Sequence, residues 1–200
     1  MNINYAINKV QNYDLEGFRA INNLVPKLKP INQFMKIVAR FGPALFLIPL
    51  GFAYPFSKRY QSEKHRQKLS QAVVGTILVY IFNTPLRRIV GRRRPYFTHS
   101  NVHRLDPIHH QPSLPSDHAT VSFAVARVFR RESFILKIPT YILAGLISFA
   151  RVYSGEHYPS DVLIGAAIGL EIETIVERNW DAIEDGIEAA VNSSLSSRNA

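Results

Sequence analysis

The chain has 200 residues, with 24 lysines and arginines against 15 aspartates and glutamates, a formal net charge of +9, and no cysteine. This length suits one domain. The positive charge favours an anionic partner, such as nucleic acid, an anionic membrane surface or a phosphorylated substrate. The lack of cysteine excludes disulfides, thiolate metal sites and cysteine nucleophiles.

The first 36 residues are polar and rich in asparagine, and they lack the pattern of a secretory signal. Within them, residues 14 to 21 predict a short amphipathic helix. We divide the chain into an N-terminal segment (1–36), a helical domain (37–180) and a polar C-terminal tail (181–200). We expect residues 192–200 of the tail to be disordered.

The interior alternates apolar segments with basic loops. Five segments favour helices: 41–57, 69–86, 119–129, 138–150 and 162–170. No run shows the alternating pattern of a strand, so we predict an all-α fold. Gly145, Gly165 and Gly169 lie among apolar residues and predict close packing between helices.

The same segments raise the question of a membrane. A membrane-spanning helix needs roughly 20 mostly apolar residues; the first two segments come close and the other three are short. The mean hydropathy of −0.04 leaves a soluble helical bundle open. However, if five segments cross a membrane, the basic loops 58–68 and 130–137 lie on one side, which the excess of lysine and arginine makes cytoplasmic. We therefore predict a multi-helix transmembrane bundle in the cell membrane.

The segment 119–129 is preceded by Pro115-Ser116-Asp117-His118. Ser116 is a good N-cap and Asp117 suits a first helical turn. The free N–H groups of such a helix start bind phosphate oxygens, with the Ser116 hydroxyl as a further contact and His118 beside the bound group. The alternative is an ordinary capped helix that contains a histidine.

A second cluster holds Arg151, His157 and Asp161 around a loop-to-helix junction. Asp161 comes four residues after His157, so its carboxylate can reach the imidazole. A carboxylate on one ring nitrogen fixes the tautomer and leaves the other nitrogen as a nucleophile or base. The alternative is a local ion pair with a capping aspartate.

The most basic stretch contains arginines 87, 88, 92, 93 and 94. The arginine guanidinium matches phosphate oxygens in a bidentate manner. Arg87 and Arg94 are seven residues apart, two helical turns, and could share one face. A solvated or headgroup-facing run accounts for some of these residues, and the neighbouring apolar segments weaken a nucleic-acid interpretation.

Four histidines, His99, His103, His109 and His110, lie in the loop between these motifs. They could bind a metal. Because Asp106 is the only carboxylate nearby, we favour a flexible loop near the substrate entrance.

In this order, the three clusters resemble the type 2 phosphatidic acid phosphatase superfamily, which includes lipid phosphatases, class A acid phosphatases and vanadium haloperoxidases. The family pattern is Lys-x6-Arg-Pro, then Pro-Ser-Gly-His, then Ser-Arg-x5-His-x3-Asp. The corresponding stretches here are Arg87-x6-Arg94-Pro95, Pro115-Ser116-Asp117-His118 and Ala150-Arg151-x5-His157-x3-Asp161. The resemblance runs from about residue 12 to residue 180.

The chain departs from this pattern at three positions: Arg87 replaces lysine, Asp117 replaces glycine and Ala150 replaces serine. The aspartate variant and residues 12–22 are similar to bacterial undecaprenyl-diphosphate phosphatases of the bacitracin-resistance type.

The resemblance implies roles for the motif residues and a reaction without a metal or other cofactor. His157 attacks phosphorus, Asp161 orients it, and His118 protonates the leaving oxygen and then activates water. Phosphate oxygens are held by Arg87, Arg94, Ser116, Asp117 and Arg151.

We therefore expect a membrane phosphatase with its site on the outer face, acting on undecaprenyl diphosphate. Phosphatidylglycerol phosphate or phosphatidate is the alternative substrate. The other interpretations are a soluble acid phosphatase or vanadate-dependent oxidase, and a non-catalytic protein that binds anionic lipid or nucleic acid. The motif spacing disfavours the last interpretation.

Overall fold

The computed structural model describes residues 3–59 and 63–198. The described part of the chain contains helices and loops and no strand, as the apolar patterning predicts. In chain order the elements are α1 (Ile3–Asn22), η1 (Lys29–Ile31), α2 (Asn32–Arg59), α3 (Glu63–Val90), α4 (Pro95–Thr98), α5 (Asp117–Val128), α6 (Phe134–Tyr153), α7 (Pro159–Arg178) and α8 (Trp180–Arg198).

All five predicted helices are present, as α2, α3, α5, α6 and α7, and each begins before its apolar segment. Four of them also continue beyond it, whereas α5 ends at Val128, one residue before the end of its segment. Basic residues assigned to the first loop, such as Lys64 and Lys68, instead belong to the first turns of α3. The C-terminal tail also differs from the prediction, because α8 is helical to Arg198. Residues 199 and 200 lie outside the described part.

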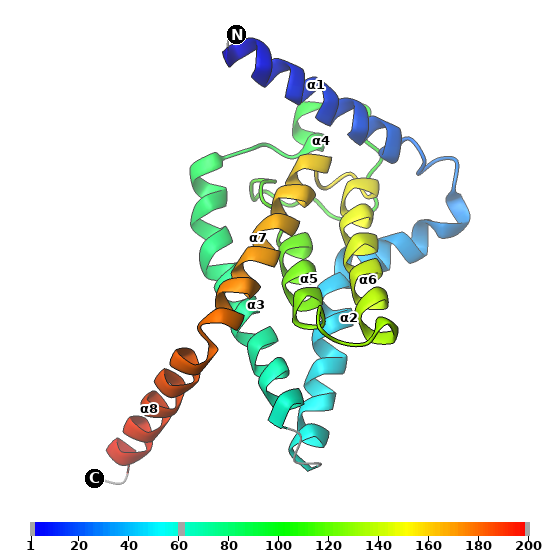
Figure 1. Ribbon diagram of the computed structural model, residues 1–200. Helices are drawn as coiled ribbons and strands as arrows, with labels where there is room; N and C mark the ends of the chain where they lie inside the picture. The colour runs from blue at the N-terminus through cyan, green and yellow to red at the C-terminus, as the bar shows by residue number, and fades with distance from the viewer. Residues whose placement is uncertain (1–2, 60–62, 199–200) are drawn as a thin grey trace.

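Helix α5 lies at the centre of the bundle, between α3, α6 and α7 and beside α2 (Figure 1). Its buried residues are small and occupy most of its circumference: Ala119, Thr120, Val121, Ser122, Ala124, Val125, Ala126 and Val128. This helix can be enclosed on all sides because it presents few charges and little bulk. The N-terminus of α5 lies at one end of the bundle, near the loops that follow α3 and α6 (Figure 1).

Glycines allow α7 to approach α5 closely. A Cβ atom built on Gly165 would lie 2.9 Å from the Ser116 carbonyl oxygen, and one on Gly169 would lie 3.0 Å from the Ala124 nitrogen. The predicted close packing is therefore confirmed for these two glycines. It is wrong for Gly145, whose Cβ would meet no atom within 4 Å.

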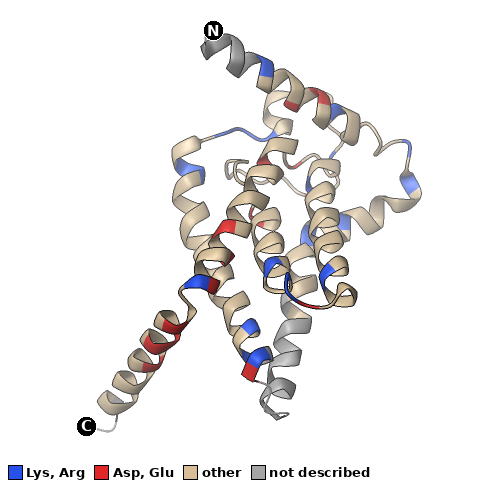
Figure 2. Ribbon diagram, viewed as in Figure 1, with Lys and Arg blue, Asp and Glu red and all other residues tan. Residues whose placement is uncertain are grey.

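The charged residues of the bundle lie mostly near its two ends, and the middle stretches of its helices carry few of them (Figure 2). Large exposed side chains include Ile81 on α3, Ile142 on α6 and Leu163 on α7, each more than 60% exposed (63%, 65% and 69%). Two helical stretches, Arg66–Thr98 and Phe134–Tyr153, are long and apolar enough to cross a membrane. Large apolar side chains exposed on several helices of one bundle are expected where a protein contacts lipid or another protein.

The end of the bundle away from α1 is held by ion pairs between helices. Lys68 on α3 pairs with Glu132 in the α5–α6 connection, and Arg130 pairs with Glu177 on α7 at 2.8 Å. Helix α8 continues from this end and points away from the bundle (Figure 1).

Candidate active site

The three sequence clusters meet at the end of the bundle covered by α1. A cavity of about 240 Å³ opens there. Six of the eight predicted site residues line it: Arg87, Arg94, Asp117, His118, Arg151 and His157. The other lining residues were not predicted for the site: Arg40, Asp106, Pro107, His109 and Gln111. Ser116 and Asp161 lie behind this wall and are fully buried.

His157 lies in the loop between α6 and α7 and is 3% exposed. The loop turns at Gly155, whose φ of +82° is a conformation that favours glycine. The His157 Nε2 atom lies 3.3 Å from Arg94 Nη1, in the cavity wall. Burial, together with the charges of Arg94 and Arg151, holds the pKa of His157 well below its ordinary value. The imidazole is therefore neutral near pH 7, and a neutral ring has a lone pair available for attack.

Asp161 is near His157, but the two do not form a direct hydrogen bond. The Asp161 Oδ2 to His157 Nδ1 distance is 3.6 Å, and Nδ1 has no hydrogen-bond partner among the described residues. Oδ2 accepts a hydrogen bond from the Tyr158 N–H at 2.8 Å, and Oδ1 accepts one from Arg92 at 2.7 Å. The predicted contact is thus present at ion-pair distance, with Arg92 as an unpredicted third member.

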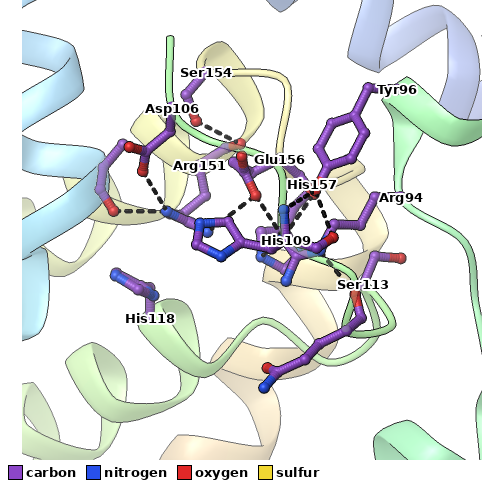
Figure 3. A network of polar contacts seen from close by, with 12 residues as sticks. Arg94, Tyr96, Asp106, His109, Ser113, His118, Arg151, Ser154, Glu156 and His157 are labelled. Carbon is purple, nitrogen blue, oxygen red and sulfur yellow. Dashed lines mark hydrogen bonds and ion pairs between the residues drawn. The ribbon is translucent and has the colours of Figure 1, made fainter. Parts of the chain in front are cut away.

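Arg94 and Arg151 converge on one buried carboxylate, that of Glu156 (Figure 3). Glu156 Oε2 lies 2.7 Å from Arg94 Nη1 and 3.5 Å from Arg151 Nη2. Arg151 also donates to the Ala39 carbonyl at 2.8 Å and lies 3.8 Å from Asp106. These contacts fix both guanidinium groups before any ligand arrives, which lowers the entropy cost of binding an anion.

Arg87 is held by the residue that replaces the motif glycine. It forms an ion pair with Asp117, whose other oxygen accepts a hydrogen bond from Asn83 at 2.9 Å. The aspartate variant therefore places a negative charge at the cavity wall and neutralises the arginine that replaces the motif lysine.

Helix α5 begins at Asp117, as predicted. The Ser116 side chain, however, makes no capping hydrogen bond, and its Oγ has no partner in the described part of the chain. Its N–H donates to the Asp161 carbonyl at 3.1 Å, so the start of α5 is tied to the start of α7. The prediction that the Ser116 side chain caps α5 is therefore wrong. Its predicted contact with phosphate stays a prediction.

His118 stands apart from the network around Glu156, at the start of α5 (Figure 3). Its Nε2 lies 3.2 Å from the carbonyl oxygen of Arg40 on α2. Because His157 and His118 line the same cavity, a group bound there can contact both imidazoles.

The histidine-rich loop forms part of the cavity wall. Asp106, His109 and Gln111 line the cavity, and the His109 backbone is bonded through both N–H and carbonyl to the Tyr96 hydroxyl, at 2.9 and 2.8 Å. Within residues 3–59 and 63–198 there is no group of three or more metal-ligating side chains.

Sequence reasoning missed several contributors. Glu156 and Arg92 belong to the sequence clusters that contain His157 and Arg94. Their closeness to these residues in the sequence is the signal that could have identified them. No local signal marks Arg40, because only the packing of α2 against α5 and α6 brings it to the site.

Comparisons with known proteins agree with this geometry. The family model of the PAP2 superfamily matches residues 68–181. The undecaprenyl-diphosphatase BcrC of Bacillus subtilis is 26% identical over 182 residues, which cover 90% of each chain.

Two solved structures share the fold. The crystal structure of LpxE from Aquifex aeolicus has a TM-score of 0.66 and 31% identity, and covers 82% of this chain and 94% of its own. A transmembrane PAP2-type phosphatidylglycerolphosphate phosphatase from Bacillus subtilis has a TM-score of 0.68 and 21% identity, over 88% of each chain. Since the family match covers more than half of the chain and the relatives include named phosphatases, the protein belongs to the PAP2 superfamily and is a phosphoric ester hydrolase.

Proposed function

We propose that the protein is a membrane lipid phosphatase that hydrolyses undecaprenyl diphosphate to the monophosphate through a phosphohistidine. The observation that carries the proposal is the buried, neutral His157, with Nε2 in a cavity also lined by Arg94, Arg151 and His118. The likeness to the undecaprenyl-diphosphatase BcrC over 90% of the chain supports the choice of substrate.

In the first step, His157 Nε2 bonds to the terminal phosphorus while the bond from phosphorus to the bridging oxygen breaks. His118, whose pKa is lowered to about 3 by burial and by the charge of Arg151, needs the negative charge of the bound diphosphate to become protonated. It then gives that proton to the bridging oxygen of the departing lipid monophosphate. Neutral His118 then takes a proton from water, whose oxygen attacks phosphorus and breaks the N–P bond to release phosphate.

The fixed arginines stabilise the charge that spreads over the phosphoryl oxygens in both steps. Arg94 and Arg151 line the cavity and are oriented by Glu156. Loss of one such donor costs roughly 100- to 1,000-fold in rate.

The membrane placement is part of the proposal. Lys64, Lys68, Arg130 and Arg131 lie at the end of the bundle opposite the cavity, and basic residues in the loops between spans favour the cytoplasmic side. Arginines 87, 88, 92, 93 and 94 at the cavity end are an exception to this rule, which the phosphate site accounts for. The cavity end would then face outward, with the apolar flanks of α3, α6 and α7 in lipid. A carbonate wash tests this placement, because release of the protein into the supernatant would contradict it.

The substrate is tested by phosphate release from a lipid panel. Purified protein is assayed on undecaprenyl diphosphate, phosphatidylglycerol phosphate and phosphatidate, with His157→Ala as the control. We expect the highest kcat/KM for undecaprenyl diphosphate. A preference for either glycerolipid would correct the substrate, and full activity of His157→Ala would overturn the mechanism.

A further inference from the structure

The N-terminal helix α1 lies outside the family-matched residues 68–181 yet is packed onto the active-site end of the bundle (Figure 1). Phe18 is 1% exposed and its ring lies 5.6 Å from that of Tyr158, the residue after His157. Asn22 donates to the carbonyls of His103 and Tyr153 at 2.7 and 2.9 Å. Helix α1 is therefore seated by specific contacts with the loops that carry the site.

One helical turn before Phe18, Asp14 reaches the start of α7. Its Oδ1 accepts a hydrogen bond from the Ser160 N–H at 2.8 Å, and its Oδ2 accepts one from the Ser160 hydroxyl at 2.6 Å. Ser160 is the second residue of α7, so Asp14 satisfies a free N–H at the N-terminus of that helix. A carboxylate from α1 thus caps the helix that carries Asp161.

The same carboxylate forms an ion pair with Arg92. Arg92 in turn donates to Asp161 Oδ1 at 2.7 Å and lies over the Tyr158 ring, 4.0 Å from its centroid. One guanidinium therefore joins two carboxylates, that of Asp14 from α1 and that of Asp161 from α7. Asp14 is 8% exposed and Asp161 is fully buried, so water screens these charges little.

We propose that Asp14 is a positioning residue for the catalytic pair: through Arg92 it holds the Asp161 carboxylate toward His157. The proposal rests on the role of His157 as nucleophile. Asp14 serves this role in two ways. Asp14 fixes the orientation of the Arg92 guanidinium. The negative charge of Asp14 also offsets the positive charge of Arg92, so that the Asp161 carboxylate still attracts a proton on the His157 ring.

The charge balance around the pair makes this role measurable. The groups that face His157 are Arg87, Arg94, Arg151, His118 and Asp161. The adjacent carboxylate of Glu156 pairs with two of these groups, Arg94 and Arg151. The groups that face Asp161 are Arg92 and, through it, Asp14. Removing the Asp14 charge leaves Arg92 less compensated, which disfavours the protonated form of His157 and weakens its support as phosphorus is attacked.

The test compares Asp14→Asn, which keeps the shape of the side chain, with Glu16→Gln, which makes the same charge change at an exposed position of the same helix. On the best lipid of the panel, we expect Asp14→Asn to lower kcat by roughly tenfold, the size of one lost hydrogen bond to a charged group, with KM nearly unchanged. The acid limb of the kcat profile should move to lower pH. Glu16→Gln should match the wild type in kcat, KM and pH profile.

A double-mutant comparison identifies the route. In an Arg92→Gln background, Asp14→Asn should cost much less than it does alone, since the intermediary is already lost. A purely structural role for Asp14 would lower thermal stability and the amount of active enzyme while leaving the pH profile in place, and that result would overturn the inference. A wild-type kcat for Asp14→Asn would do the same. The His157→Ala variant separates the two claims. If His157→Ala is inactive while Asp14→Asn behaves as the wild type, only the positioning role of Asp14 is refuted. If His157→Ala is active, the proposed function itself is refuted.

Discussion

The approach of α7 to α5 sets the geometry of the site, and replacing Gly169 with alanine tests it. The added Cβ would clash with the Thr120 carbonyl oxygen and lie 3.0 Å from the Ala124 nitrogen. Both atoms belong to the α5 backbone, so no side-chain rotation relieves the contact. The helices must separate instead, by roughly 1 Å, a displacement that in an active site can cost up to about 100-fold in rate.

The change in unfolding free energy caused by Gly169→Ala can be compared with that caused by a matched control, Gly145→Ala. Overpacking costs about 1–3 kcal/mol, whereas glycine to alanine in a helix gains up to about 1 kcal/mol. Gly145→Ala on α6 meets no atom within 4 Å and should show only the gain. Both variants carry this gain, so they should differ by the overpacking cost alone, about 1–3 kcal/mol, or roughly 2–12 °C in Tm for a chain of this size.

The assay is thermal unfolding of both variants in the same detergent, with kcat measured on the best lipid substrate. Gly169→Ala should unfold at a lower temperature and lose activity, because α5 carries His118 and α7 carries Asp161. Gly145→Ala should equal or exceed the wild type in Tm and keep its kcat. Equal Tm and kcat for the two variants would refute the reasoning that backbone contact between α5 and α7 limits the size of this residue.

Three further predictions concern the chemistry. His118→Gln should lower kcat roughly 100- to 10,000-fold and let a phosphohistidine accumulate, which a base-stable, acid-labile label on enzyme quenched in alkali would detect. Absence of label together with wild-type turnover would contradict the role of His118. Because the folded-state pKa of His157 is lowered, the nucleophile stays neutral below the ordinary histidine value of about 6.5, so the acid limb of kcat/KM should lie below that pH. Arg94→Gln removes a positive charge from beside the ring and should move the limb upward, and a limb that stays in place would argue against His157 as the titrating group. Asp117→Asn releases Arg87 from its ion pair and should lower KM by roughly fivefold, about 1 kcal/mol for a partly exposed pair; an unchanged KM would mean that Arg87 does not contact the phosphate.

Much of the fold follows from local patterns. The five apolar segments become helices because a helix satisfies its own backbone hydrogen bonds while its apolar side chains are buried, and this holds even where Pro85 and Pro139 fall inside a helix. Helix α5 begins where Ser116 and Asp117 predict it, and the three motifs meet at one end of the bundle. The C-terminal tail was harder to predict, because its low hydropathy suggested disorder although α8 is helical to Arg198.

The site depends more on partners that are distant in the sequence. Glu156 binds Arg94 across 62 residues, and Arg92 joins Asp14 to Asp161 across 78 and 69 residues. Nothing in the local pattern around these residues specifies which carboxylate each guanidinium will meet.

The sequence by itself determined the helical class, the order of the motifs and the residue types available for phosphoryl chemistry, because these depend on composition and spacing along the chain. Only the tertiary structure decided which charges pair and which glycines are needed. Gly145 and Gly169 have similar apolar neighbours in the sequence, but only Gly169 faces the backbone of another helix. The physical reason is that steric contact and Coulomb energy depend on separation in space, and packing alone sets that separation.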